Sequence, residues 1–105
     1  MADINKLIEE LNGELKKLYS DYKGVYFHGS RLNEKAQEES DYDLVFIFER
    51  EIDWKFEEEI WRIVYNYDLK YNIVIDARIY SSKEIKTPVT PFKESVLTQS
   101  KYYAA

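Results

Sequence analysis

The sequence predicts an α/β (α+β) protein in which helices flank a small mixed β-sheet. Three observations lead to this prediction. Two long segments repeat apolar residues at the three- and four-residue spacing of amphipathic helices. Three short segments are rich in β-branched and aromatic residues, as buried strands are. A further short helix is expected at the end of the chain. With it, the segments follow one another in the order helix, strand, strand, helix, strand, helix.

The first half of the chain predicts one helix and two strands. Apolar spacing predicts a helix over 4–22, and Gly24 is expected to stop it. A short strand is expected over 25–28. The polar residues 31–40 predict a loop, and the aromatic and β-branched run that follows predicts a strand over 41–48.

The second half predicts a helix, a strand and a last helix. Helical spacing returns over 53–68, and an apolar strand is expected over 73–80. Residues 81–89 are expected to form a loose connection. Thr90 is a good capping residue and is followed by proline, which favours the first helical position, so the last helix is expected over 91–103.

Length and composition limit the classes of function. The 105 residues predict one domain over residues 1–105. The formal net charge of −5 argues against a protein that grips nucleic acid along its phosphates. There is no cysteine and His28 is the single histidine, which excludes disulfide frameworks, thiolate metal sites and histidine-rich metal sites. No apolar run could span a membrane and no signal peptide is visible, so a cytoplasmic protein is expected.

Two aspartates lie one residue apart at the start of the second expected strand. Side chains alternate across a sheet, so Asp41 and Asp43 are expected on one face, where their carboxylates repel each other. A divalent cation would balance this charge, and magnesium accepts carboxylate oxygens together with phosphate oxygens and water. Asp76, within the third strand, completes a three-carboxylate cluster if the two strands are neighbours. The alternative is that Asp76 only pairs with Arg78, two residues farther along.

The end of the first expected strand is a candidate phosphate site. Gly29 and Ser30 follow the strand directly, and backbone amides at the start of a helical turn bind anions. The Ser30 hydroxyl adds a donor and Arg31 a charged one, although an isolated Gly-Ser pair is more often an ordinary turn. His28 is expected to be a structural strand residue, with a catalytic base as the alternative. Beside carboxylates that could hold two metal ions, a phosphate site predicts phosphoryl or nucleotidyl transfer from a nucleoside triphosphate.

These residues resemble the DNA polymerase beta-type nucleotidyltransferase superfamily, and more narrowly its minimal nucleotidyltransferases (MNT), the antitoxins of HEPN/MNT toxin–antitoxin pairs. The resemblance rests on a motif and a later aspartate: Gly29-Ser30, ten residues, Asp41-Tyr42-Asp43, and Asp76. It covers about residues 20–80. It implies the nucleotidyltransferase fold and transfer of a nucleoside monophosphate from a triphosphate to an acceptor hydroxyl.

The resemblance also implies roles for single residues. By position in the motif, Asp41 and Asp43 would hold two Mg²⁺ ions, and Asp76 would bind metal and help to activate the attacking hydroxyl. Gly29 and Ser30 would hold the triphosphate, and ATP is the nucleotide that the family implies. Related antitoxins adenylylate a tyrosine of their paired toxin. The implied partner is therefore a HEPN-type toxin that AMPylation would neutralise.

The acceptor must come from another protein or a second copy, because no acceptor-binding lobe is expected in so short a chain. Trp54, Trp61 and Tyr65 lie about 100° or more around the second helix from its apolar face, and such a stripe suits an interface. The alternative is that the C-terminal segment covers the stripe. Two further functions stay open: an antitoxin that acts by docking alone, and a subunit that modifies a small molecule such as an aminoglycoside. The oligomeric state stays open as well, a homo-oligomer included.

Overall fold

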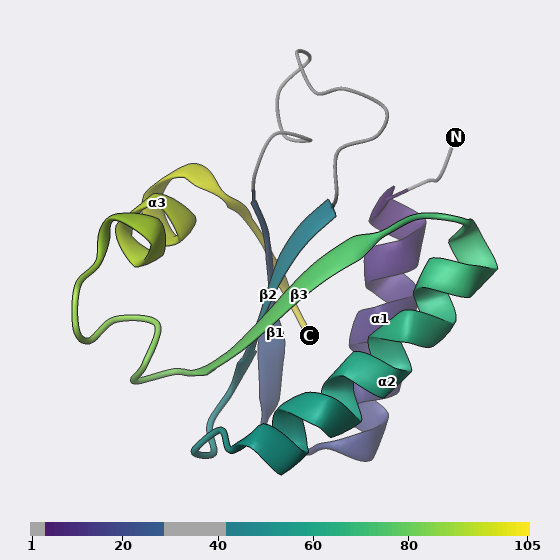
Figure 1. Cartoon of the computed structure of the whole chain (residues 1–105), viewed down its shortest axis with the longest axis horizontal. Helices are drawn as coiled ribbons and strands as arrows, with labels where there is room; N and C mark the ends of the chain where they lie inside the picture. The colour runs from purple at the N-terminus through teal and green to yellow at the C-terminus, as the bar shows by residue number, and fades with distance from the viewer. Residues whose placement is uncertain (1–3, 29–41) are drawn as a thin grey trace.

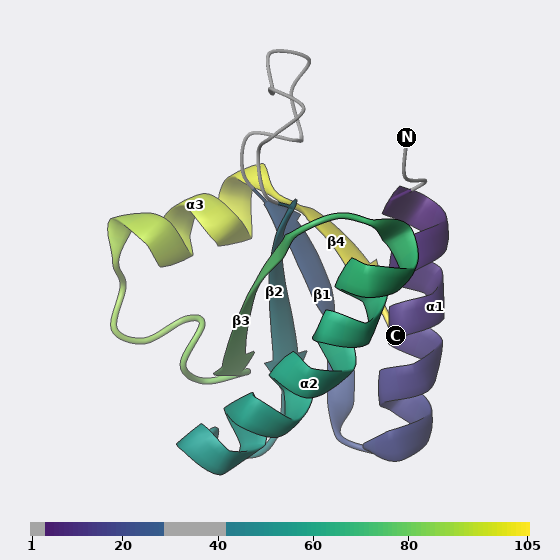
Figure 2. The same cartoon turned by 45° about the vertical axis from the view of Figure 1, so that its right-hand side comes forward.

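Helices cover both faces of a four-stranded sheet in the computed structural model of the chain, which describes residues 4–28 and 42–105. The elements are, in order, α1 (Ile4–Leu18), β1 (Tyr22–His28), β2 (Tyr42–Phe48), α2 (Trp54–Tyr71), β3 (Ile75–Ser81), α3 (Pro91–Gln99) and β4 (Lys101–Ala104). Helices α1 and α2 lie on one side of the sheet and α3 on the other (Figures 1 and 2). The predicted fold class is confirmed. No helix in the described part of the chain is long and apolar enough to cross a membrane.

The sheet is mixed, as predicted. Its strand order is β3-β2-β1-β4, with β1 antiparallel to both β2 and β4 and with β2 parallel to β3. A parallel pair needs a crossover that returns the chain to the end where it started, and α2 provides it. Strands β3 and β4 are therefore the two edges. The first residues of β2 and β3 lie at the same end of the sheet as the last residue of β1 (Figure 1).

Local sequence signals set the starts of two helices. At α2 the Asp53 carboxylate accepts a hydrogen bond from the backbone N–H of Phe56 at 2.8 Å. At α3 the Thr90 hydroxyl oxygen accepts from the backbone N–H of Lys93 at 3.1 Å, and proline occupies the first turn as predicted. Both caps satisfy amide groups that have no partner inside the helix.

The predicted end of the first helix is wrong. Helix α1 stops at Leu18, and Tyr22 is instead the fully buried first residue of β1, where its hydroxyl donates to Asn12. Gly24 does not end a helix but lies within β1 with a φ of 152°. A Cβ atom there would approach the carbonyl oxygen of Tyr103 to 2.5 Å. Glycine is needed because β4 passes directly beside it.

The last predicted helix is too long. It ends at Gln99, and the next residues form β4, which pairs with β1 from Gly24 to Phe27. Within the helix, Val96 is fully buried and its neighbour Leu97 is exposed. The segment expected to be a loose connection is in fact packed, because Ile85 within it is buried against the α3 side of the sheet.

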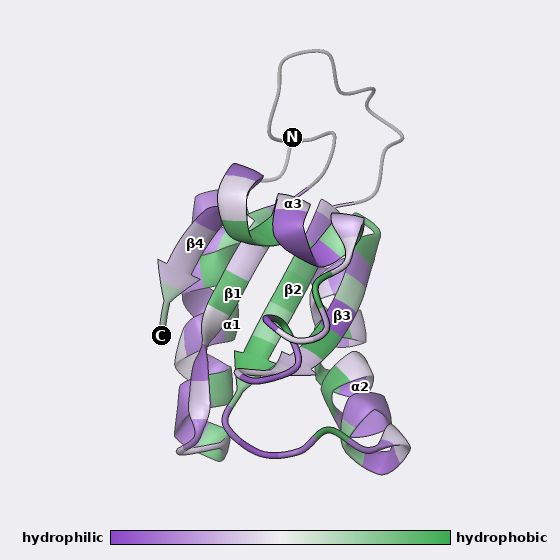
Figure 3. Cartoon of the chain, turned by 90° about the vertical axis from the view of Figure 1, so that its left-hand side faces the viewer, coloured by the Kyte–Doolittle hydropathy of each residue, from purple (hydrophilic) through white to green (hydrophobic). Residues whose placement is uncertain are grey.

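Two separate clusters form the core. The larger lies between the sheet and the helices α1 and α2, and it contains the apolar stripes of both helices and alternate residues of the strands, among them Leu44, Phe46 and Phe48. The smaller lies under α3 and has four buried members: Val45, Ile47, Ile85 and Val96. Figure 3 looks onto this second face, where the hydrophobic strand β2 is visible beneath α3. Strand alternation thus gives each helical layer its own set of side chains.

Candidate active site

Two of the predicted carboxylates are direct neighbours in the sheet. Asp43 of β2 and Asp76 of β3 are register partners in the parallel pair, and His28 of β1 is the register partner of Asp43 on the other side. The three residues therefore form one row across three strands, at the end where β2 and β3 begin (Figure 1). All three are partly exposed. Below, the carboxylate pair means Asp43 and Asp76.

The carboxylate pair faces the α3 side of the sheet. Asp43 lies two residues before Val45, which belongs to the small cluster under α3, and alternate residues of a strand share a face. Tyr80, four residues after Asp76, packs against the same cluster. Two carboxylates placed side by side on one face repel each other, which favours a bound cation between them.

Four predicted site residues lie outside the described residues. They are Gly29, Ser30, Arg31 and Asp41, and their roles in phosphate and metal binding stay predictions. Within residues 4–28 and 42–105, no group of three or more histidine, cysteine, aspartate or glutamate side chains could hold a metal ion. Of the three predicted metal ligands, the described part of the chain contains Asp43 and Asp76, and Asp41 lies outside it.

His28 is held by contacts with the α3 region. Its Nδ1 atom lies 2.8 Å from the hydroxyl oxygen of Ser100, just after α3. Its ring and that of Phe92 are nearly perpendicular, with the two ring centroids 5.6 Å apart. These contacts tie the end of β1 to both ends of α3, which suits the structural interpretation of His28.

Two cations lie on the same face in addition to the predicted site residues: Arg78, expected only as an ion-pair partner of Asp76, and Lys93, which is not among the predicted site residues. The Arg78 guanidinium lies over the ring of Phe92 at 4.2 Å from its centroid, and the Lys93 ammonium lies over the ring of Tyr80 at 5.3 Å. Two cation–π contacts thus join β3 to α3, one with the cation on β3 and one with the cation on α3. None of the ion pairs between described residues includes Arg78 or Asp76, so the expected alternative of an Asp76–Arg78 pair is not seen.

Of these two cations, Arg78 could be placed on this face from the sequence, by the strand alternation that also places the aspartates. Arg78 follows Asp76 by two residues in the same strand and so shares its face. Lys93 gives no such signal, because its position depends on how α3 packs. An arginine whose planar side is occupied by an aromatic ring still presents N–H donors that suit phosphate oxygens.

A surface hollow of about 340 Å³ lies between α2 and β3, beside the carboxylate pair. Its lining includes Asp76 from β3 and Trp61, Tyr65 and Asp68 from α2. The indole N–H of Trp61 donates to the carbonyl oxygen of Ala77 at 3.0 Å, which holds this side chain against the edge strand. The hollow therefore lies at the edge of β3, where the aromatic stripe of α2 borders the strand that carries Asp76.

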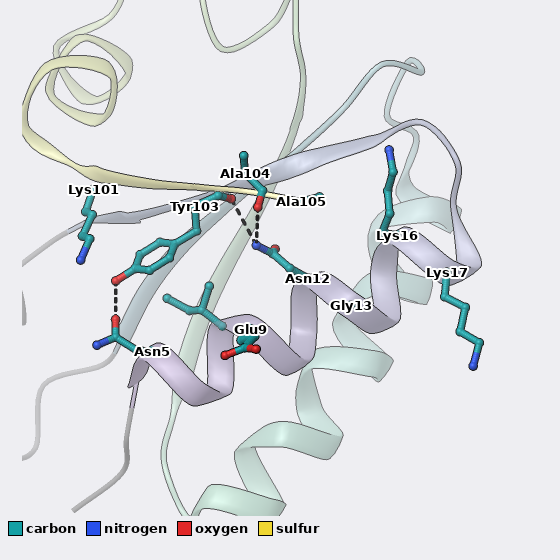
Figure 4. A pocket seen from close by; sticks show the side chains of 11 residues that line it. Asn5, Glu9, Asn12, Gly13, Lys16, Lys17, Lys101, Tyr103, Ala104 and Ala105 are labelled. Atoms are coloured by element: carbon teal, nitrogen blue, oxygen red, sulfur yellow. Dashed lines mark hydrogen bonds between the residues drawn. The ribbon is translucent and has the colours of Figure 1, made fainter.

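A larger groove lies at the opposite edge of the sheet, between α1 and β4 (Figure 4). It has a volume of about 870 Å³. The side-chain amide of Asn12 donates to the carbonyl oxygens of Tyr103 and Ala104, and the Tyr103 hydroxyl donates to Asn5 at 2.7 Å. Because β3 and β4 are opposite edges, the sheet separates this groove from the carboxylate pair. Although this groove is the larger of the two, its distance from the carboxylate pair argues against it as the reaction site.

Comparison with known proteins adds a family to this geometry. No curated protein matches the chain. A family model described as "Polymerase beta, Nucleotidyltransferase" matches residues 6–101, and so includes nearly all of the helices and strands. The match contains both members of the carboxylate pair, which the fold places side by side. The chain therefore belongs to the polymerase beta nucleotidyltransferase family.

Proposed function

We propose that the protein transfers AMP from ATP to a hydroxyl group of a partner protein, most simply a tyrosine of a HEPN-type toxin, and thereby acts as an antitoxin. Family membership supports nucleotidyl transfer in general. The observation that carries the proposal is the register pairing of Asp43 with Asp76, because a site for a triphosphate–metal complex needs neighbouring carboxylates.

The donor set of the site fits magnesium. The described residues offer two neighbouring, partly exposed carboxylates, and hard oxygen ligands with room for water are what Mg²⁺ prefers. Asp43 and Asp76, together with Asp41, would hold the two ions. When bound, the ions would supply charge stabilisation to the phosphate oxygens.

The residues of the chain supply the remaining chemistry. In the proposed reaction the acceptor oxygen forms a bond to the α-phosphorus, the bond between that phosphorus and the β-phosphate bridging oxygen breaks, and pyrophosphate leaves. Asp76 accepts the proton of the acceptor hydroxyl. Arg78 and Lys93, on the same face of the sheet, contact oxygens of the triphosphate and neutralise charge on the leaving group.

A protein acceptor is supported by the motif from Gly29 to Asp43, which resembles that of antitoxins that modify a paired toxin. Two observations would favour the alternatives: neutralisation without transfer would indicate a docking antitoxin, and transfer to an aminoglycoside would indicate a small-molecule enzyme.

The deciding experiment is intact-mass spectrometry of the protein encoded by the neighbouring gene. That protein is incubated with this chain, Mg²⁺ and each of ATP, GTP, CTP and UTP in turn. We expect a mass gain of one or more adenylate units with ATP. The gain should disappear with an Asp41→Asn, Asp43→Asn double variant. Neutralisation that survives in this variant would support docking alone, and an unchanged mass with the wild-type chain would contradict the proposal.

A further inference from the structure

We propose that the exposed aromatic side chains of α2 form the docking surface for the acceptor protein, and that this partner presents an apolar anchor flanked by arginine or lysine. Below, the α2 ridge means Trp54, Trp61 and Tyr65. This inference rests on the proposed function and names the surface through which the acceptor reaches the site.

The ridge is strongly exposed for such large side chains. The exposed fractions are 67% for Trp54, 47% for Trp61 and 58% for Tyr65. The C-terminal segment does not cover them, because it forms β4 at the opposite edge of the sheet. Exposed tryptophan and tyrosine in a row are typical of the residues that dominate binding energy at protein interfaces.

The ridge reaches the edge strand that carries Asp76. Trp61 and Tyr65 line the same hollow as Asp76, to which the proposed reaction assigns the acceptor proton. The Asp76 side chain shares the α3 face with Asp43, so a protein seated on the ridge would lie at the β3 edge and reach this carboxylate around that edge. This continuity distinguishes the ridge from the groove between α1 and β4, which lies across the sheet from the site.

The charge beside the ridge selects the chemistry of the partner. Apart from Asp76, which is proposed to hold Mg²⁺, the two hollows along it are lined by three carboxylates and two cations: Glu58, Glu59, Asp68, Lys55 and Arg62. Arg62 is already engaged with Glu58 at 2.9 Å. A basic partner surface complements this excess of negative charge, whereas a second copy of the same surface would bring like charges together.

Two backbone groups of the edge strand behind the ridge are already hydrogen-bonded to side chains of α2, which disfavours one mode of docking. The Trp61 indole donates to the carbonyl oxygen of Ala77 at 3.0 Å, and the backbone N–H of Ile75 donates to the Asp68 carboxylate at 3.2 Å. A partner could not add a strand there without breaking these bonds. The partner protein is therefore expected to bind side chains of the ridge, among which Trp61 is already held in place by its hydrogen bond.

The two tryptophans make a direct test possible, because the chain contains no others. The chain is labelled with 5-fluorotryptophan, and its two fluorine resonances are assigned with Trp54→Phe. The probe is the purified protein encoded by the neighbouring gene. We expect both resonances to shift when this protein is added and to stay unchanged with Mg²⁺ and ATP alone. Unchanged resonances in the presence of the protein would overturn the proposal.

Binding measurements on variants complete the test. We expect Trp61→Ala to weaken binding of the same protein by about 10-fold or more. Glu58→Lys should weaken it as well, by reversing a charge of the surface. The matched control is Val89→Ala, since Val89 is 75% exposed and lies on the segment before α3. Full affinity in Trp61→Ala, or an equal loss in Val89→Ala, would overturn the proposal.

The docking and transfer proposals can fail separately. Affinity that depends on Trp61 without any adenylate mass gain would leave the docking surface standing and overturn the chemistry. Adenylylation that proceeds at the wild-type rate in Trp61→Ala, at acceptor concentrations below saturation, would do the reverse. Fluorine resonances that shift with the concentration of the chain alone would show that a second copy occupies the ridge, which also overturns the proposal.

Discussion

The two faces of the sheet perform different tasks. The face under α1 and α2 is packed along its whole length by the larger apolar cluster. The face under α3 has a small cluster only, and the row of His28, Asp43 and Asp76 lies beside it with Arg78. A sheet can separate stability from chemistry in this way because neighbouring residues of each strand point to opposite faces. Five predictions test that separation.

The largest expected effect is on activity. Asp76→Asn removes one charge from the polar face and leaves the shape of the side chain nearly unchanged. We expect nucleotidyl transfer to fall by about 10³-fold, the scale at which single groups of metal-assisted and electrostatic catalysis contribute. The measurement is the initial rate of adenylate transfer. Thermal unfolding should show equal or greater stability, and a variant that loses activity by unfolding would contradict the division between the faces.

The second prediction compares two fully buried valines on opposite faces. Val25 belongs to the larger cluster and Val96 to the smaller one. We expect Val25→Ala to lower the free energy of unfolding by about 2–3 kcal/mol and Val96→Ala by about 1–2 kcal/mol, because a thin layer can relax into the space left behind. Urea unfolding of both variants provides the values. Equal losses would show that the α3 layer is packed as tightly as the other face.

The third prediction concerns nucleotide binding on the α3 side. Arg78→Gln removes a guanidinium that is proposed to contact the triphosphate, so the affinity for Mg²⁺–ATP should fall about 10-fold. The affinity for AMP should change less, because AMP has neither the β- nor the γ-phosphate. Titration calorimetry measures both affinities. The control is Arg62→Gln, an exposed arginine of α2 on the opposite side of the sheet, and an equal effect there would contradict the assignment.

The fourth prediction concerns the helical layer of the packed face. Gly13 lies in the middle of α1, and a Cβ atom added there would meet nothing within 4 Å. Gly13→Ala should therefore raise the free energy of unfolding by about 1 kcal/mol, since alanine restricts the unfolded chain and favours the helix. Activity should be unchanged. A loss of stability would show that this side of α1 needs the open space.

The smallest expected effect is a pH dependence of the melting temperature, which comes from the ion pair between Asp21 and Arg50. The hydrogen bond from Arg50 holds the pKa of Asp21 below its usual value of 3.8. A lowered carboxyl pKa stabilises the fold above pH 3.8, and this contribution is lost as the pH falls through the pKa of the folded state. We expect Asp21→Asn to lower the melting temperature slightly near neutral pH. This difference should shrink under strongly acidic conditions, and a constant difference would contradict the linkage.

Much of the fold could be predicted because helices and strands carry local signals. The apolar spacing of α1 and α2 and the β-branched run of β2 identify these elements without any partner. The capping residue Thr90 marks the start of α3. The ends of the helices were less predictable. Tyr22 fits a helical pattern but is buried as a strand residue, because its hydroxyl donates a hydrogen bond to Asn12 and its strand pairs with β2.

The strand β4 could not be predicted from its own residues. Lys101–Ala104 has no strong strand pattern, and it pairs with β1 only because Gly24 leaves room for it. The exposure of the α2 ridge also depends on the pairing of β4 with β1, since a C-terminal helix could have covered the ridge. Pairing of distant segments is a property of the assembled sheet, and no short stretch of sequence records it.

The local order of residues thus determined most of the helices and strands, although not β4 or the end of α1. It also determined which acidic residues belong to strands and which motif they form. It also placed an aromatic stripe on α2. Only the tertiary structure decided that β2 and β3 are parallel neighbours in a register that puts Asp43 beside Asp76. Periodicity depends on neighbours in the chain and can be read along it. The meeting of two carboxylates depends on the crossover of α2 and on packing between remote segments.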